Sequence, residues 1–238
     1  MKWFYNFKIA VKLIASFTIM ALIAAVVGFV GLYNMKRITN ADTLLFEQNT
    51  LGINYTGNAS TYYQRLKYNI AEAILLKDDS LRENYVSSLN GYIETIDEQL
   101  ASYESGITNQ EDLQIFSELK PQWEQYRSYM KNVIQYIQYG QYENAQKMLL
   151  EEADDIGDEV RDLLVSLVEY NERHALERSE LNAEMARTAE TLMILIIIIG
   201  IIIAVVLGLF IARIISKPIT KVVEAADRLA VGECKQGQ

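Results

Sequence analysis

Two apolar stretches, each long enough to cross a membrane, constrain what this chain of 238 residues can fold into. Residues 13–32 and 192–212 contain no charged side chain. An α-helix rises 1.5 Å per residue, so roughly 20 residues cover the roughly 30 Å hydrocarbon core of a bilayer. The sequence therefore predicts transmembrane helices over 13–32 and 191–212, with residues 33–190 forming a domain between them on one side of a membrane.

Charge is distributed unevenly along the chain. Residues 38–190 carry 12 basic and 28 acidic side chains, whereas the rest of the chain carries 10 basic and 3 acidic ones. Basic side chains are retained on the cytoplasmic side of a membrane. We therefore expect a multi-pass protein of the cell inner or plasma membrane. Its stub (1–12) and its last segment (213–238) would be cytoplasmic, and 33–190 extracytoplasmic. An acidic outer domain without a basic stripe argues against a nucleic-acid partner.

The first apolar stretch is interpreted as an uncleaved signal anchor, because it is longer than the apolar region of a signal peptide and lacks an Ala-x-Ala-like cleavage site. Small residues recur at Ala21 and Ala25 and at Ala24 and Gly28. This spacing permits two membrane helices to approach closely, although it is equally common in spans that do not pair. Cys234 is the only cysteine, so no disulfide stabilises the outer domain and a partner chain is expected to contribute.

Apolar residues between the two stretches follow the 3-4 spacing of helical seams. The first two seams are Leu51, Tyr55, Ala59, Tyr62, Leu66, Ile70, Ala73 and Lys77, and then Leu81, Tyr85, Leu89, Tyr92, Ile96, Leu100 and Tyr103. The third is Leu113, Phe116, Leu119, Trp123, Tyr126, Met130, Val133 and Ile137. The fourth is Ala145, Leu149, Glu152, Ile156, Val160, Leu163, Leu167, Tyr170 and His174, and it continues in phase to Leu192.

Turn and cap residues separate these seams. The cluster 77–80 offers a turn, Thr108 and Glu111 have the spacing of a capping box, and Gly140 fits the position after a helix end. No breaker interrupts the chain between Tyr33 and Leu76, or within the fourth seam. The predicted fold is therefore all-α: an antiparallel up-down-up-down four-helix bundle anchored by two transmembrane helices, the last of which is continuous with the bundle.

The segment after the second apolar stretch begins Ile-Ile-Ser-Lys-Pro-Ile over 214–219 and continues with apolar residues at helical spacing. A proline fits the first position of a helix, where its missing N–H is not needed. The segment resembles the first helix of a HAMP domain, cut short by the end of the chain. The residues that this resemblance assigns to signal transmission are Pro218, Ile219, Val222, Ala226 and Leu229.

Together with the bundle, the chain resembles the sensory half of a methyl-accepting chemotaxis protein, and residues 44–53 are similar to the start of the first helix in that family. The resemblance implies a homodimeric chemoreceptor module that binds a small ligand, or a ligand-loaded binding protein, outside the cell. A helix shift would then pass through the second span to HAMP. The chemotaxis kinase and its coupling protein would be engaged only through a C-terminal region that this sequence does not contain.

Candidate recognition residues lie on the first and third seams. Tyr62, Arg65 and Asn69 share one helical stripe, and Tyr126 and Arg127 fall at the same level of an antiparallel bundle. The resemblance implies a ligand carboxylate held by an arginine at this level, for which a guanidinium offers a bidentate fork. The alternative is that Arg65 simply pairs with an acid of the fourth seam. A further alternative is a cationic ligand at the acid run 151–162, which otherwise reads as a solvated helix face.

Enzymatic chemistry finds little support in the sequence. His174 is the only histidine, and no metal-binding cluster, phosphate-binding glycine loop or paired nucleophile and base is present, so neither catalysis nor a cofactor is expected. His174 itself is expected to be a packed or partly solvated bundle residue. Two other functions remain open: an input module of a sensor histidine kinase or cyclase with the same front end, and a non-sensing membrane assembly module.

Overall fold

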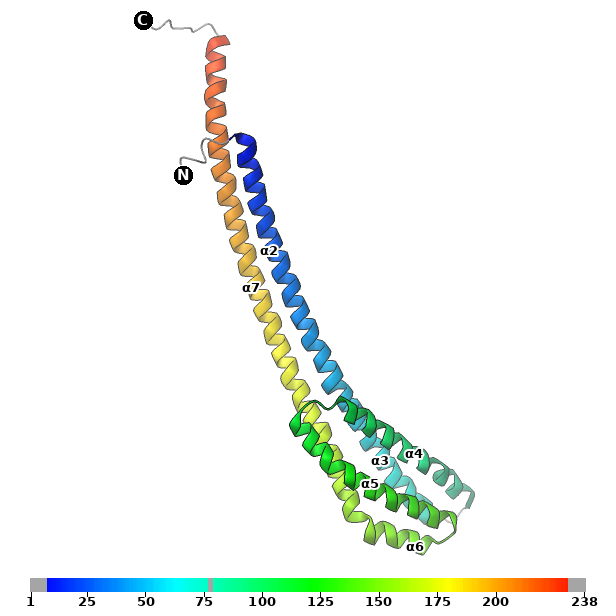
Figure 1. The fold of residues 1–238 in the computed structure, drawn as a ribbon. Helices are drawn as coiled ribbons and strands as arrows, with labels where there is room; N and C mark the ends of the chain where they lie inside the picture. Colours follow the sequence, from blue (N-terminus) through cyan, green and yellow to red (C-terminus); the bar gives the residue numbers. More distant parts are fainter. Residues whose placement is uncertain (1–7, 77–78, 231–238) are drawn as a thin grey trace. The chain divides into compact units, whose positions relative to one another are not determined.

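The computed structural model describes residues 8–76 and 79–230, and the regular structure in these two ranges is entirely helical (Figure 1). In chain order the elements are α2 (Ile9–Leu44), η1 (Leu45–Thr50), α3 (Leu51–Leu75), α4 (Asp79–Gly106), α5 (Gln110–Gln138), α6 (Tyr142–Lys147), η2 (Met148–Glu152) and α7 (Asp154–Ala230). They form two compact units, one of Thr39–Asn182 and one of Met1–Ile38 with Ala183–Gln238. The predicted all-α fold is confirmed.

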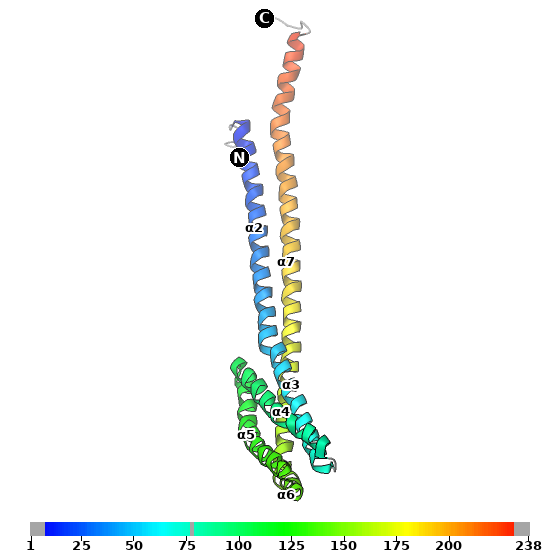
Figure 2. The same ribbon diagram turned by 90° about the vertical axis from the view of Figure 1, so that its right-hand side faces the viewer.

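The Thr39–Asn182 unit is an antiparallel bundle of α3, α4, α5 and the first part of α7, with α6 at one end (Figures 1 and 2). One apolar stripe of each helix faces the common core, where a fully buried aliphatic side chain contributes about 1.5–3 kcal/mol. The core includes Ala59, Tyr63, Leu66, Ile70, Leu89, Ile93, Ile96, Leu100, Phe116, Leu119, Trp123, Tyr126, Met130, Val133, Val160, Leu164 and Leu167.

The first seam is confirmed at Ala59, Leu66, Ile70 and Ala73, whereas Gly52, Thr56 and Tyr63 are buried where Leu51, Tyr55 and Tyr62 were predicted. Tyr63 is fully buried, whereas Tyr62 is half-buried and packs at the edge of the core against Tyr92 of α4, with 5.9 Å between ring centroids. The buried residues Ala59, Tyr63 and Leu66 are spaced by four and three, which is the ordinary stripe of an α-helix. Both tyrosines fit an apolar pattern, so the sequence alone did not distinguish them. Lys77 lies outside the described residues.

The start of the third helix differs from the prediction. Asn109, rather than Thr108, caps α5, and its side-chain oxygen accepts a hydrogen bond from the Glu111 N–H at 2.8 Å. With α5 beginning at Gln110, the buried stripe starts at Asp112 instead of Leu113, which is 46% exposed. A carboxylate in the first turn of a helix is favoured by the amides exposed there, which compensates in part for burying it.

Gly140 ends the third helix as predicted. Its φ of 71° lies in the left-handed region, where glycine has no steric penalty. The Gln141 N–H donates to the Tyr136 carbonyl at 2.8 Å, closing the end of α5 in the manner of a Schellman motif. The chain then turns directly into α6.

The predicted single helix from Ala145 onward is wrong at its beginning. Three pieces replace it: α6, the π-helical η2 and then α7, with Ala153 in a bend between the last two. The Ala153 N–H donates to the Met148 carbonyl at 3.0 Å, five residues back, which is the hydrogen bond of a π turn. Asp154 and Asp155 occupy the first turn of α7, where carboxylates favour a helix start. From Asp154 to Ala230 α7 has no break.

A second π-helical segment, η1, separates α2 from α3. The Leu51 N–H donates to the Phe46 carbonyl, again five residues back. The chain nevertheless stays helical from Ile9 to Leu75, as the absence of breakers predicted.

The second unit pairs α2 with the later part of α7 in an antiparallel arrangement. A Cβ placed on Gly200 would lie 3.1 Å from Cγ2 of Ile23, and one on Gly31 would lie 3.3 Å from Cε of Met193, so the two helices approach closely at both glycines. Both helices are long and apolar enough to cross a membrane. Their most apolar segments are 6% and 0% buried within the chain, so neither segment is a core helix of this chain's own bundle.

Pro218 lies inside α7, so the prediction that a separate helix begins at this proline is wrong. An interior proline costs about 3 kcal/mol, but no glycine interrupts the chain between Gly208 and Gly232, and helix-forming residues flank the proline on both sides. Val222 and Ala226 are exposed. The side chains of Pro218, Ile219 and Leu229, together with residues 231–238, lie outside what the structure describes.

Candidate functional site

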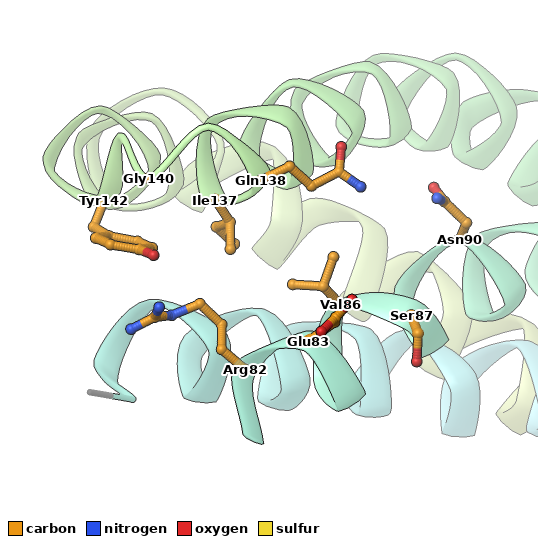
Figure 3. Close-up of a pocket in the computed structure, with 9 residues that line it drawn as sticks. All are labelled: Arg82, Glu83, Val86, Ser87, Asn90, Ile137, Gln138, Gly140 and Tyr142. Atoms are coloured by element: carbon orange, nitrogen blue, oxygen red, sulfur yellow. The ribbon is translucent and has the colours of Figure 1, made fainter. Parts of the chain in front are cut away.

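A cavity of about 590 Å³ opens at the end of the bundle where α4 begins and α5 turns into α6 (Figure 3). This volume lies in the range of small-molecule sites. Its lining consists of Arg82, Glu83, Val86, Ser87, Asn90, Ile137, Gln138, Gly140 and Tyr142. Figure 3 shows Arg82 and Tyr142 at one end, the Asn90 and Gln138 amides on facing helices at the other, and apolar Val86 and Ile137 between them.

Arg82 fixes one wall of this cavity. It is buried, and its Nε donates to the Ala73 carbonyl at 3.1 Å while a terminal nitrogen donates to the Leu76 carbonyl. Its guanidinium carbon lies 4.2 Å from the centroid of the Tyr142 ring, a cation–π contact. Arg82 thus satisfies carbonyls at the end of α3 and ties α3 and α4 to α6, which holds the cavity open in a defined shape.

Arg65, the arginine singled out from the sequence, lies on the exposed face of α3. Its guanidinium carbon is 5.2 Å from the centroid of the Tyr62 ring, which in turn packs on Tyr92. Asn69, one helical turn further on, is half-buried. In the described part of the chain Arg65 forms no ion pair, and Asp158 of α7 is paired with Lys67 and Arg161. The expectation that Arg65 pairs with an acid of the fourth helix is therefore not met there.

Tyr126 is not part of that surface. Only 1% of Tyr126 is exposed, and its ring lies 5.3 Å from that of Tyr63 in the middle of the core. The Tyr63 hydroxyl donates to the Gly157 carbonyl at 2.5 Å. Burial raises the pKa of Tyr63 to about 12, so this hydroxyl remains a donor at any physiological pH. The two tyrosines join α3, α5 and α7 and leave no face of Tyr126 for a ligand.

Arg127 also has a partner within the bundle. It pairs with Asp97 of α4 at 2.8 Å, and the other carboxylate oxygen of Asp97 accepts from the Trp123 indole N–H at 2.7 Å. Both members of the ion pair are about one-third exposed, so the pair is accessible from solvent without being free. Of the five recognition residues predicted from the sequence, the structure brings together Tyr62 and Arg65, keeps Asn69 beside them, and separates Tyr126 and Arg127 from them.

A polar network crosses the bundle at its other end, near the turn between α4 and α5. The Tyr103 hydroxyl donates to Asp112 at 2.5 Å and accepts from the Asn171 amide at 2.7 Å, and that amide also donates to the Leu167 carbonyl. Gly52 of α3 lies against the Asn171 side chain so closely that no Cβ fits between them. The network therefore joins α3, α4, α5 and α7 at one level.

Burial raises the pKa of Asp112, and the hydrogen bond from Tyr103 opposes this only in part. The pKa of Asp112 is therefore higher in the folded chain than in the unfolded chain. As pH falls, the folded chain binds the proton first, and this proton uptake favours the folded state. Relative to Asp112→Asn, which keeps the acceptor for Tyr103 but does not titrate, the wild type should therefore gain stability between about pH 7 and about pH 4. Melting temperatures of both proteins across this interval measure the difference. A gap that moves in the opposite direction would contradict the burial argument.

Within residues 8–76 and 79–230, no group of three or more His, Cys, Asp or Glu side chains is placed to hold a metal ion.

Sequence reasoning missed the cavity. Its residues come from the ends of helices, where apolar periodicity is weakest, and polar side chains such as Glu83 and Gln138 look like ordinary surface there. One signal was present: Arg82 lies two residues after the turn cluster 77–80, and Tyr142 lies two residues after Gly140. Both flank predicted turns, and turns at one end of a bundle lie close together.

A four-helix bundle whose last helix continues into an apolar segment of membrane-spanning length has the architecture of a membrane-bound sensory domain. Residues 6–186 match the family described as "Four helix bundle sensory module for signal transduction", and the chain belongs to this family. A protein of Acetivibrio thermocellus named "Putative sensory transducer protein" is 40% identical over 168 residues, which are 71% of this chain. The match covers 30% of that relative, so the chain corresponds to less than a third of its length.

Proposed function

We propose that this chain is the sensory module of a transmembrane chemoreceptor, which binds a small ligand or a ligand-loaded binding protein outside the cell. The observation that carries the proposal is α7, one helix from the bundle core at Val160 to Ala230 with a membrane-length apolar segment within it. A ligand that binds two packing states of the bundle with different affinity shifts their populations. A continuous helix gives that shift a direct route to the far side of the membrane.

The charge distribution supports the orientation of this proposal. The bundle belongs to the acidic segment 38–190, and the basic residues Arg213, Lys217, Lys221 and Arg228 follow the second span. Under the positive-inside rule, the bundle is extracytoplasmic and both termini are cytoplasmic.

Two surfaces of the bundle are the proposed places of ligand contact. The Arg65–Tyr62 surface offers an exposed guanidinium, held over an aromatic ring, that can reach a carboxylate. The cavity beside Arg82 offers an open hollow of about 590 Å³ with an apolar centre and amides on facing helices. A free small molecule fits the cavity, whereas a binding protein or a second copy of the chain fits the exposed Arg65–Tyr62 surface.

We propose that the module acts as a homodimer. Ala21, Ala24, Ala25 and Gly28 are exposed on α2, and a Cβ on Gly28 would meet nothing within 4 Å. Within the described chain α2 uses Ile23 and Gly31 against α7 instead, so the small residues are available to a second copy.

Transmission to a HAMP domain is the last part of the proposal. Pro218, Ile219, Val222, Ala226 and Leu229 would form the packing stripe of its first helix, and Val222 and Ala226 are exposed and available for this. The region that engages a chemotaxis kinase and its coupling protein would lie beyond residue 238, as would the kinase core or cyclase of the alternative function.

A ligand screen on the full chain in nanodiscs tests the proposal. Amino acids, organic acids and amines are added one at a time, and a ligand that binds only the folded state raises the melting temperature. For an anionic hit at the predicted surface, Arg65→Ala should weaken binding about tenfold or more, as expected for loss of a charge-assisted hydrogen bond. Arg187→Ala removes another exposed arginine outside this surface and serves as the matched control.

The outcomes of the screen separate the alternatives. A panel that leaves the melting temperature unchanged, with no binding protein captured on the bundle, would favour the non-sensing assembly module. A hit whose affinity is unaffected by Arg65→Ala removes Arg65 from the site, and Asn90→Ala and Gln138→Ala then test the cavity.

A further inference from the structure

The cavity between α4 and the end of α5 has a lining that favours one kind of ligand. Four of its residues lie on a single stripe of α4, at relative positions 0, 3, 4 and 7: Glu83, Val86, Ser87 and Asn90. Ile137 and Gln138, from the last turn of α5, border the opposite side (Figure 3). A small molecule in this hollow would therefore extend along α4 and meet charged, apolar and amide side chains in turn.

Arg82, at one end of the cavity, is already engaged by the fold. Only 8% of it is exposed, and its guanidinium donates to the carbonyls of Ala73 and Leu76. The guanidinium carbon also lies 4.2 Å from the centroid of the Tyr142 ring. An anionic ligand that took over this guanidinium would leave carbonyls at the end of α3 unpaired, which is unfavourable. The cavity is therefore poorly suited to hold an anion through Arg82.

Glu83 is the acidic residue of the lining, and the fold does not use its charge. The side chain is exposed, and within residues 8–76 and 79–230 its carboxylate forms no ion pair or hydrogen bond. The surroundings act in the same direction, because residues 38–190 carry 28 acidic and 12 basic side chains. An excess of negative charge raises the local concentration of cations. This part of the cavity therefore favours a cation and repels a carboxylate.

Asn90 and Gln138 supply the neutral polar part of the lining. Figure 3 shows their amides on facing helices, at the end of the cavity away from Arg82. Both side chains are exposed, and neither amide is hydrogen-bonded to another residue that the structure describes. A carboxamide can both donate and accept hydrogen bonds. The pair is therefore suited to a neutral group that does the same, such as an amide or a hydroxyl.

The middle of the cavity is apolar. Val86 is half-buried and Ile137 is buried, and both lie between the two ends of the hollow (Figure 3). The hydroxyl of Ser87, one position further along α4, already donates to the Asn84 carbonyl at 2.8 Å. A carbon chain that covers this part would remove apolar surface from water, which favours binding.

We propose that this cavity binds small organic cations, in which a short carbon chain separates an ammonium group from a neutral polar group. The ammonium group donates to the Glu83 carboxylate. The carbon chain lies on Val86 and Ile137, and the neutral group exchanges hydrogen bonds with the amides of Asn90 and Gln138. This assignment rests on the proposed sensory function for its biological role, and it gives that function a class of ligand.

Isothermal titration of the full chain in nanodiscs tests the proposal with four related compounds. The probe is 4-aminobutanamide. Butanamide lacks its ammonium group, butylamine lacks its amide, and butanoate carries the opposite charge. We expect 4-aminobutanamide to bind about tenfold or more tightly than butanamide, as one hydrogen bond to a charged group predicts, and butanoate not to bind. The affinity for 4-aminobutanamide should fall as salt is added, because salt screens exposed charges.

Two glutamates of α4 provide a matched pair of variants. Glu83→Gln and Glu94→Gln remove the same charge from exposed positions, but only Glu83 lines the cavity. Glu83→Gln should abolish the preference for 4-aminobutanamide over butanamide, whereas Glu94→Gln should keep it. Asn90→Ala should weaken the binding of 4-aminobutanamide and leave that of butylamine unchanged.

Several results would overturn the assignment. Butanoate could bind as tightly as the amines, or all four compounds could fail to bind at about 10 mM. An equal loss of affinity in Glu83→Gln and Glu94→Gln would assign the effect to the overall charge of the domain. None of these results affects the sensory proposal, because the Arg65–Tyr62 surface and a binding protein remain. Conversely, an amine that binds through Glu83 without changing an environment-sensitive dye on Ser216→Cys would support the cavity and count against sensing through it.

Discussion

Gly157→Ala should destabilise the bundle, although alanine is the better helix former. A Cβ at this position would lie 2.8 Å from Cε2 of Tyr126 and 3.1 Å from the hydroxyl oxygen of Tyr63. Both rings are fully buried and pack on each other, so neither can move away without disturbing the core. Overpacking of this kind costs about 1–3 kcal/mol. Melting temperature should fall by about 2–4 °C for each kcal/mol lost.

Gly91→Ala is the matched control for this substitution. Gly91 is also inside a helix, α4, but it is exposed and a Cβ there would meet nothing within 4 Å. The gain in helix propensity should therefore stabilise this variant by up to about 1 kcal/mol. If both alanines shifted the melting temperature in the same direction, the close packing of Gly157 against the two tyrosines would not be what fixes α7 in the bundle.

Ala183→Pro should uncouple the two ends of α7. Position 183 is exposed in the middle of the helix, so proline creates no clash in the core. It does remove one backbone hydrogen bond of the helix, and its ring clashes with the carbonyl group four residues earlier. Together these effects cost about 3 kcal/mol or more. A ligand found in the screen should still raise the melting temperature. The signal is measured with an environment-sensitive dye attached to Ser216→Cys, in a Cys234→Ser background that leaves no other thiol. With Ala183 in place, the fluorescence of the dye should change when the ligand binds. With Ala183→Pro, most of this change should be lost.

Ala183→Leu controls for the loss of alanine itself, because leucine supports a helix nearly as well. It should keep both the binding and the dye response. A dye response that persists in Ala183→Pro would sink the proposal that a continuous α7 carries the signal, and it would direct attention to α2 instead.

The overall architecture could be predicted because it depends on repeated signals. Each helix buries many residues at 3-4 spacing, so an error at Tyr62 or Leu113 leaves the helix and its direction unchanged. The membrane-length segments depend on uninterrupted apolar character, which is visible without any structure. The end of α5 was predicted at Gly140 because one residue type dominates that conformation.

Details that depend on a single hydrogen bond could not be predicted. Thr108 and Asn109 are both good caps, and the choice of Asn109 moves the buried stripe by one residue, from Leu113 to Asp112. The π turn at η2 and the bend at Ala153 have no marker such as proline or glycine. For this reason the fourth seam was extended through them as one helix.

The candidate site was predicted only in part, for a related reason. Residue level along an antiparallel bundle can be read from the sequence, and the predicted Tyr62 and Arg65 do lie together, with Tyr62 against Tyr92 of α4. The direction in which a side chain points around its helix is less certain. Tyr126 shares that level but points into the core, and Arg127 finds Asp97 on the neighbouring helix.

The π-helical segment η1 has a consequence for how relatives of this chain should be aligned. A π turn holds one residue more than the α-helical turn it replaces, while the chain on either side keeps its axis. A relative with one residue fewer between positions 45 and 50 is therefore expected to form an uninterrupted α-helix. It would still place the equivalent of Gly52 against Asn171 and the equivalent of Tyr63 against Gly157. Sequence gaps of one residue are expected to gather at this point, and to be tolerated there when they are rejected in the rest of the helix.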